Sequence, residues 1–136
     1  MNYKTSLLIT VGIALIFSSA WYPFQDDELA KSKERGKQLY EELCVTCHLA
    51  EGTGTEGVFP PLAKADYLAK NREGAIHAVK FGQEGEIKVN GVVYNSMMPA
   101  PGLNDQEIAD VMNYIQNSWG NKGKYVTPKE VEKITQ

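Results

Sequence analysis

The feature that most constrains this chain is the pentapeptide Cys44-Val45-Thr46-Cys47-His48, which contains both of its cysteines. Two thiols three positions apart lie close together on one helical turn. That spacing lets them add to the two vinyl groups along one edge of a haem, with the imidazole of His48 beneath the iron. The pattern is typical of covalent haem attachment. It predicts thioether bonds at Cys44 and Cys47 and an axial ligand at His48.

Three other uses of these cysteines compete with haem attachment. A disulfide between them would close a very small loop and add little stability. A thioredoxin-like dithiol needs a βαβ setting, whereas this region has a helical pattern without flanking strands. A structural zinc site needs four ligands, and the chain offers two cysteines and two histidines, with His77 far from His48. Haem attachment is therefore the favoured interpretation.

The N-terminal residues have the pattern of an export signal. Lys4 precedes an apolar run that ends at Phe17 and is followed by small residues. We expect residues 1–20 to be a signal peptide; the alternative is an uncleaved membrane anchor formed by residues 7–24. Either interpretation places the protein in the periplasm or on the outer face of the cytoplasmic membrane. Residues 21–31 are polar and acidic, and we expect them to be a linker.

Residues 32–136 are predicted to form one domain, because the chain has an ordinary length for a single core. We expect short helices over residues 32–43, 66–71, 72–81 and 105–119, and a terminal one after Thr127. Ser32 is the expected N-cap of the first helix, and Asn104 and Glu107 form a capping box for the fourth. The net charge of −3 argues against nucleic acid as a partner.

The segment before the methionines has the pattern of a β-hairpin. The dipeptide Asn90-Gly91 lies between two runs rich in β-branched residues, which predicts a type I′ turn. Two strands alone are only marginally stable. The hairpin must therefore lean on another part of the protein, and a haem edge is a candidate.

A proline-stiffened loop carries two candidate iron ligands, Met97 and Met98, followed by Pro99. A methionine thioether is a soft ligand that suits haem iron. Neighbouring residues on an extended chain point in opposite directions, so only one methionine can coordinate. His77 is a less favoured alternative as a second ligand.

These motifs, in this order, resemble those of class I (His/Met-ligated) cytochromes c, over about residues 33–120. The resemblance implies an all-α cytochrome c fold of three to five short helices wrapped round one covalently bound haem c. The small hairpin before the methionine loop is an addition to the shortest members of the family. It resembles a hairpin in cytochrome c modules attached to bacterial oxidoreductases.

The resemblance also implies roles for individual residues. Pro60 would present its carbonyl to His48, Leu62 would pack on the haem, and Met98 would be the distal ligand. Gly36 and Tyr40 would cross the last long helix near Val111 and Tyr114.

These roles imply an electron carrier, not an enzyme. A monohaem cytochrome of this kind transfers single electrons between redox partner proteins such as a dehydrogenase, a reductase or a terminal oxidase. The alternative is a haem enzyme or small-molecule-binding haem protein with a displaceable sixth ligand. An enzyme needs a vacant iron position with acid–base groups above it, whereas here a methionine is expected in that position.

Overall fold

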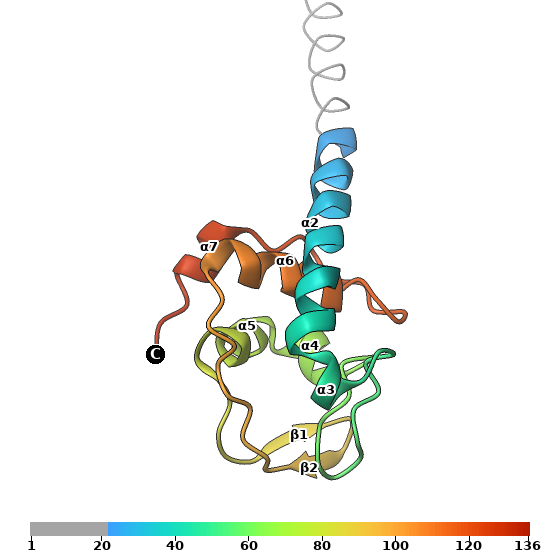
Figure 1. Cartoon of the computed structure of the whole chain (residues 1–136), viewed down its shortest axis with the longest axis vertical. Helices are drawn as coiled ribbons and strands as arrows, with labels where there is room; N and C mark the ends of the chain where they lie inside the picture. The colour runs from blue at the N-terminus through green and yellow to red at the C-terminus, as the bar shows by residue number, and fades with distance from the viewer. Residues whose placement is uncertain (1–21) are drawn as a thin grey trace, which may run out of the picture. The chain divides into compact units, whose positions relative to one another are not determined.

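The computed structural model describes residues 22–136 (Figure 1). The elements are α2 (Tyr22–Leu43), α3 (Val45–His48), α4 (Asp66–Lys70), α5 (Arg72–Phe81), β1 (Ile87–Val89), β2 (Val92–Tyr94), α6 (Asp105–Ile115) and α7 (Pro128–Glu132). The chain divides into two units between Lys31 and Ser32, and the unit Ser32–Gln136 contains the site. The expected all-α architecture with one small hairpin is confirmed. The signal or anchor predicted for residues 1–20 lies outside the described residues.

Helix α2 begins well before the residue at which the sequence predicts a start. Residues 22–31, expected to be a linker, are helical, and Lys31 pairs with Asp27 one turn earlier at 2.7 Å. The expected N-cap at Ser32 is wrong, because this residue lies inside the helix and its buried hydroxyl donates to Asp110 instead. None of the helices within residues 22–136 is long and apolar enough to cross a membrane.

A glycine allows α2 and α6 to approach closely. A Cβ atom on Gly36 would collide with the carbonyl of Asp110 and come within 2.9 Å of the Val111 nitrogen. One turn further along α2, the ring of Tyr40 lies 5.3 Å from that of Tyr114. The crossing therefore lies where the resemblance implies it.

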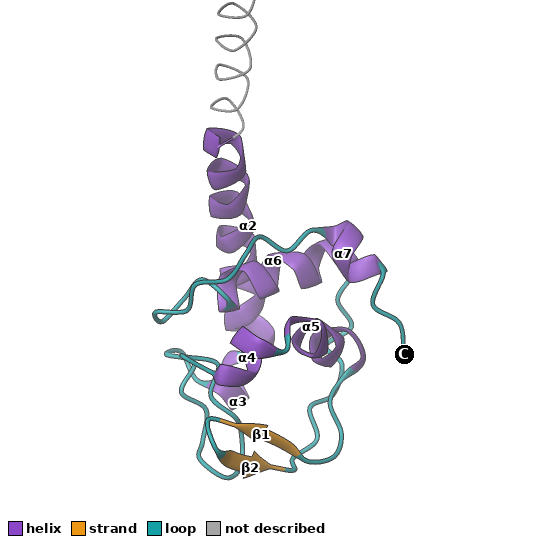
Figure 2. Ribbon diagram, turned by 180° about the vertical axis from the view of Figure 1, so that it is seen from behind, coloured by secondary structure: helices purple, strands orange, loops and turns teal. Residues whose placement is uncertain are grey.

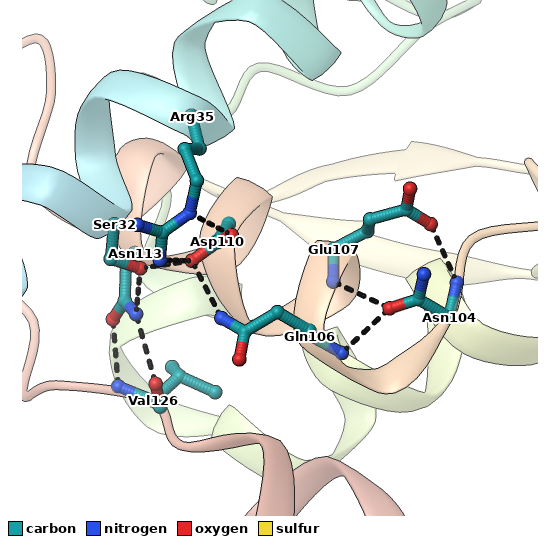
Figure 3. A network of polar contacts seen from close by, with 8 residues as sticks. All are labelled: Ser32, Arg35, Asn104, Gln106, Glu107, Asp110, Asn113 and Val126. Atoms are coloured by element: carbon teal, nitrogen blue, oxygen red, sulfur yellow. Dashed lines mark hydrogen bonds and ion pairs between the residues drawn. The ribbon is translucent and has the colours of Figure 1, made fainter.

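Buried polar contacts hold the same two helices and the C-terminal segment together (Figure 3). The carboxylate of Asp110 accepts hydrogen bonds from Ser32 and from Arg35. The amide of Asn113 donates to the Ser32 hydroxyl and to the Val126 carbonyl, and it accepts from the Val126 nitrogen at 2.7 Å. Each buried group in this network thus has a partner, as buried polar atoms require.

Helix α6 ends earlier than the sequence predicts. The capping box of Asn104 and Glu107 is present, but the helix stops at Ile115, and Trp119 lies beyond it with a φ of 52°. The side chain of Asn121 donates to the Ile115 carbonyl at 2.8 Å and so satisfies one of the last helical acceptors. Trp119 is therefore not part of the apolar face of the helix. An apolar residue stands at this position because its ring packs 5.1 Å from that of Tyr40.

The hairpin is confirmed in position and turn type. Asn90 and Gly91 have φ values of 50° and 86°, as a type I′ turn requires. The backbone N–H of Asn90 donates to the Asp66 side chain, and that of Asp66 donates to the Asn90 side chain, at 2.7 and 2.9 Å. Figure 2 shows β1 and β2 on the side of α4 and α5 away from α6. The two hydrogen bonds between Asn90 and Asp66 hold the hairpin turn against the start of α4.

Candidate haem-binding site

An apolar cleft lies between the helices and the hairpin, with the candidate site residues in its lining. Its empty space, including the open mouth, is about 1260 Å³. The six residues singled out from the sequence all line it: Cys44, Cys47, His48, Pro60, Leu62 and Met98. Most of the remaining lining is aliphatic or aromatic. Such a cleft suits a large, planar and largely apolar ligand.

Helix α3 and its N-cap residue, Cys44, present the two cysteines and the histidine on a single helical turn. The His48 nitrogen donates to the Cys44 carbonyl at 3.0 Å, and the left-handed φ of 63° at Leu49 ends the helix. Cys44 and Cys47 are free thiols, so they do not form the alternative disulfide. Burial raises the pKa of the Cys44 thiol to about 11. A redox dithiol needs the opposite shift, because its attacking species is the thiolate.

The ring of His48 is held by a backbone carbonyl. Its Nδ1 lies 3.0 Å from the oxygen of Pro60. A carbonyl can only accept, so Nδ1 carries the proton, and in the neutral ring Nε2 is then the unprotonated nitrogen. Only 8% of His48 is exposed, and this burial lowers the pKa of the imidazole, against the Pro60 contact, which raises it. The ring is therefore kept neutral and oriented, as metal-ligating histidines require.

Two glycines shape the loop that brings Pro60 to His48. A Cβ atom on Gly54 would collide with the carbonyl of Phe59, and one on Gly52 would press on the Trp119 ring at 2.7 Å. Both glycines have positive φ values, of 60° and 63°. The Gly52 carbonyl also accepts from the backbone of Leu62 at 2.7 Å. The glycine-rich run therefore folds back on itself and places the proline segment beside the helix.

The methionine loop forms another wall of the cleft. Met98 and Gln83 exchange two backbone hydrogen bonds of 2.8 and 2.9 Å. Gly82 permits this contact, since a Cβ atom there would lie 2.7 Å from the Met98 carbonyl. Met97 also lines the cleft, but 66% of it is exposed, whereas Met98 packs against the core. Backbone pairing and packing thus favour Met98 as the methionine that is held in a fixed position in the cleft.

The hairpin covers the cleft, as its marginal stability suggests. Ile87, Val89 and Tyr94 line the cleft, while Val93 points outward and is 48% exposed. Tyr94 was not predicted as a site residue. The alternation of side chains along a strand predicts which of them share a face, but not what that face covers.

Two sequence-based alternatives find no support in this geometry. His77 is not among the residues that line the cleft; its ring packs 5.0 Å from that of Phe81. Within residues 22–136 no group of three or more His, Cys, Asp or Glu side chains is placed to hold a metal ion, which disfavours zinc.

Tyr67 and Leu68 also line the cleft, and the sequence did not single them out, because α4 is too short to show a periodic face.

The donor set fits haem c. Two free thiols on one helical turn lie beside a buried, oriented imidazole, and all three line an apolar cleft. These features define a small helical protein that holds one covalently attached haem.

Comparison with known proteins agrees with this class. The family model for cytochrome c matches residues 33–119. The chain is 40% identical over 116 residues to cytochrome c-552 of Thermus thermophilus, an alignment that covers 78% of each protein. It is 35% identical over 122 residues to the gluconate 2-dehydrogenase cytochrome c subunit of Pantoea cypripedii, covering 81% of this chain and 27% of that subunit. It is 31% identical over 105 residues to the cytochrome c subunit of alcohol dehydrogenase (quinone) from Gluconobacter oxydans, covering 73% of this chain and 21% of that subunit.

The chain belongs to the cytochrome c family. It is an electron-transfer protein, not an enzyme in its own right, and it carries one covalently bound haem c through Cys44 and Cys47.

Proposed function

We propose that the chain is a monohaem electron carrier in which His48 and Met98 are the two axial ligands of the iron. When bound, haem c supplies one iron that takes up and releases a single electron. The proposal rests on one observation above all: both residues line the same cleft, and a backbone contact fixes each of them. In this proposal the Pro60 carbonyl orients the imidazole and strengthens it as a donor, and Leu62 supplies apolar contact beside it.

The composition of the cleft favours a carrier over a haem enzyme. Of the described residues that line it, none is Asp, Glu, Lys or Arg, and the one histidine is His48. Enzymatic chemistry at the iron needs a vacant position with acid–base groups beside it. A protein with both axial positions filled instead changes little in structure when one electron moves.

Carbon monoxide distinguishes a filled position from an open one. The reduced holoprotein at neutral pH should keep its absorption spectrum under carbon monoxide, because Met98 fills the second axial position. Rapid spectral change together with turnover of peroxide would replace the carrier with the alternative, a haem protein with a displaceable sixth ligand.

We propose that the redox partner is a dehydrogenase, because several similar proteins are cytochrome subunits of dehydrogenases. The partner would dock at the cleft mouth, where Leu43 lines the cleft and is 48% exposed. A small, short-lived interface suffices for such contacts.

This docking proposal can be tested with a matched pair of variants. Reduction of the oxidised holoprotein by a purified gluconate or quinone-dependent alcohol dehydrogenase should slow about fivefold or more for Leu43→Glu. Gln38→Glu, which adds the same single negative charge at an exposed position on the same helix, is the control. Equal slowing in both variants would point to overall charge, and an unchanged rate in Leu43→Glu would place the docking surface elsewhere.

We propose an extracytoplasmic location, in the periplasm or on the outer face of the cytoplasmic membrane, because bacterial c-type cytochromes usually lie outside the cytoplasm and an export-like pattern precedes the domain. Mass spectrometry of the native N-terminus should find either a start near Trp21 or the intact apolar segment. The first result means a released protein and the second an anchored one. A haem-containing chain in the cytoplasmic fraction would contradict both.

A further inference from the structure

A second cavity, unrelated to haem attachment, lies between α4 and the segment that follows α6. Its volume is about 550 Å³, within the range of small-molecule sites. It shares only Ala65 and Leu68 with the lining of the haem cleft, so a thin wall separates the two. Most of the other residues in its lining carry charged or amide side chains, unlike those of the cleft.

The cavity concentrates positive charge in a chain whose net charge is −3. Lys64, Lys122 and Lys124 line it, and none of them forms an ion pair within residues 22–136. The one acidic residue in the lining is Asp66, whose carboxylate already pairs with Lys70 at 3.2 Å and accepts from the backbone. The lining thus offers three ammonium groups without a counter-ion.

A buried amide in the lining lacks a partner. Gln116 is 4% exposed and lines the cavity, and its Nε2 is a buried donor without an acceptor among the described residues. The orientation of this amide is settled, because its Oε1 accepts from the Arg72 guanidinium at 2.9 Å. An unpaired buried N–H is costly to folding. A ligand oxygen would supply the missing acceptor.

The segment that carries the lysines is held in place. The side chain of Asn121 donates to the Leu62 and Ile115 carbonyls and accepts from the Lys64 nitrogen, all within 2.9 Å. A Cβ atom on Gly120 would lie 3.2 Å from the Lys64 side chain. The backbone on either side of the cavity is therefore positioned by the fold before any ligand arrives, and the three lysine side chains that it carries are exposed.

We propose that this cavity binds a phosphate group. Three cationic donors and an amide N–H, arranged around one space, match a compact anion with several acceptor oxygens and more than one negative charge. A monocarboxylate has two oxygens and would leave donors unpaired. The phosphate belongs either to free inorganic phosphate or to a small phosphate monoester, and both present the same group to the site.

The test uses the reduced, haem-loaded protein, which is diamagnetic if both axial positions are filled, in two-dimensional NMR. Inorganic phosphate is titrated at constant ionic strength, with sodium chloride as the compensating salt. Saturable shifts should appear for the backbone N–H groups of residues 120–124 and for the Gln116 side-chain amide. Absence of saturation, or equal shifts with chloride alone, would overturn the proposal.

Two variants and a control identify the groups that bind. The triple variant Lys64→Gln, Lys122→Gln, Lys124→Gln should weaken phosphate binding about tenfold or more. Gln116→Glu keeps the acceptor for Arg72 and replaces the unpaired donor with a negative oxygen, so binding should be lost. Lys88→Gln, an exposed position on β1, should leave it unchanged.

Unchanged affinity in the triple variant, or equal weakening by Lys88→Gln, would show that phosphate senses only diffuse charge and would refute the site. A parallel titration with glycerol phosphate distinguishes the two sources, because tighter binding than that of inorganic phosphate assigns the site to a monoester. Since the test reads NMR shifts in a protein already loaded with haem, its failure would leave the electron-transfer proposal intact.

Discussion

The hydroxyl of Ser32 donates a 2.6 Å hydrogen bond to the carboxylate of Asp110, across 78 positions of sequence. Both groups are buried, and Asp110 also accepts from Arg35 and from the Gln106 amide (Figure 3). A polar contact of this kind requires one register of α2 on α6, because any other would leave a buried carboxylate without partners. The position of α2 in turn determines where the haem-attachment helix α3 begins.

We predict that Asp110→Ala destabilises the holoprotein by about 2–4 kcal/mol, because the buried hydroxyl of Ser32 and the Arg35 guanidinium lose their acceptor. Chemical denaturation followed by circular dichroism measures the change. Lys37→Ala removes an exposed, 3.8 Å ion pair on the same helix and should change stability by less than about 0.5 kcal/mol. Similar losses in both variants would show that the buried network contributes nothing specific.

We predict that Gly36→Ala destabilises the protein, even though alanine favours helix formation. The added methyl group would collide with the Asp110 carbonyl, so the two helices would have to separate. The expected loss is about 1–3 kcal/mol, the usual result of overpacking. Gln38→Ala, at an exposed position two residues along α2, is the control and should be neutral or slightly stabilising. An unchanged melting temperature for Gly36→Ala would mean that the crossing is looser than described.

Stability should fall in acid partly through one ion pair at α7. The Arg72 guanidinium contacts both carboxylate oxygens of Glu130, at 2.6 and 2.9 Å, and holds the pKa of Glu130 below its ordinary value of 4.5. Because the folded-state pKa is the lower one, the pair stabilises the fold above pH 4.5 and loses this effect as pH falls through the depressed value.

The measurement for this pair is the free energy of unfolding from pH 7 to pH 3. Glu130→Gln should be less stable than the parent protein at neutral pH, and the difference should shrink as the pH falls. Glu132→Gln, at a nearby exposed carboxylate, is the matched control. A difference between Glu130→Gln and the parent that stays constant over the whole range would show that the loss comes from packing instead of charge.

Local signals in the sequence predicted the elements that rest on local chemistry. The Asn90-Gly91 turn and the capping box at Asn104 are examples, since each needs only neighbouring residues. The start of α2 and the end of α6 were mispredicted because distant groups decide them. Ser32 is a residue type that often caps helices, yet its hydroxyl donates a hydrogen bond to Asp110 instead. Helix α6 ends at Ile115, whose carbonyl accepts a hydrogen bond from the Asn121 side chain. The haem-attachment residues were found because their chemistry requires fixed spacing, whereas Tyr67 and Tyr94 reach the cleft only through tertiary packing.

The choice between adjacent methionines is the sharpest prediction about the site. Met98→Ala should abolish the red-end charge-transfer band that methionine ligation gives the oxidised protein, because Met98 lines the cleft and is held there by its backbone pairing with Gln83. Met97→Ala should keep the band, since 66% of Met97 is exposed. The two variants remove the same side chain at neighbouring positions, so each controls for the other. Loss of the band in Met97→Ala alone would show that Met97 is the ligand, and loss in His77→Ala would replace methionine with a second histidine.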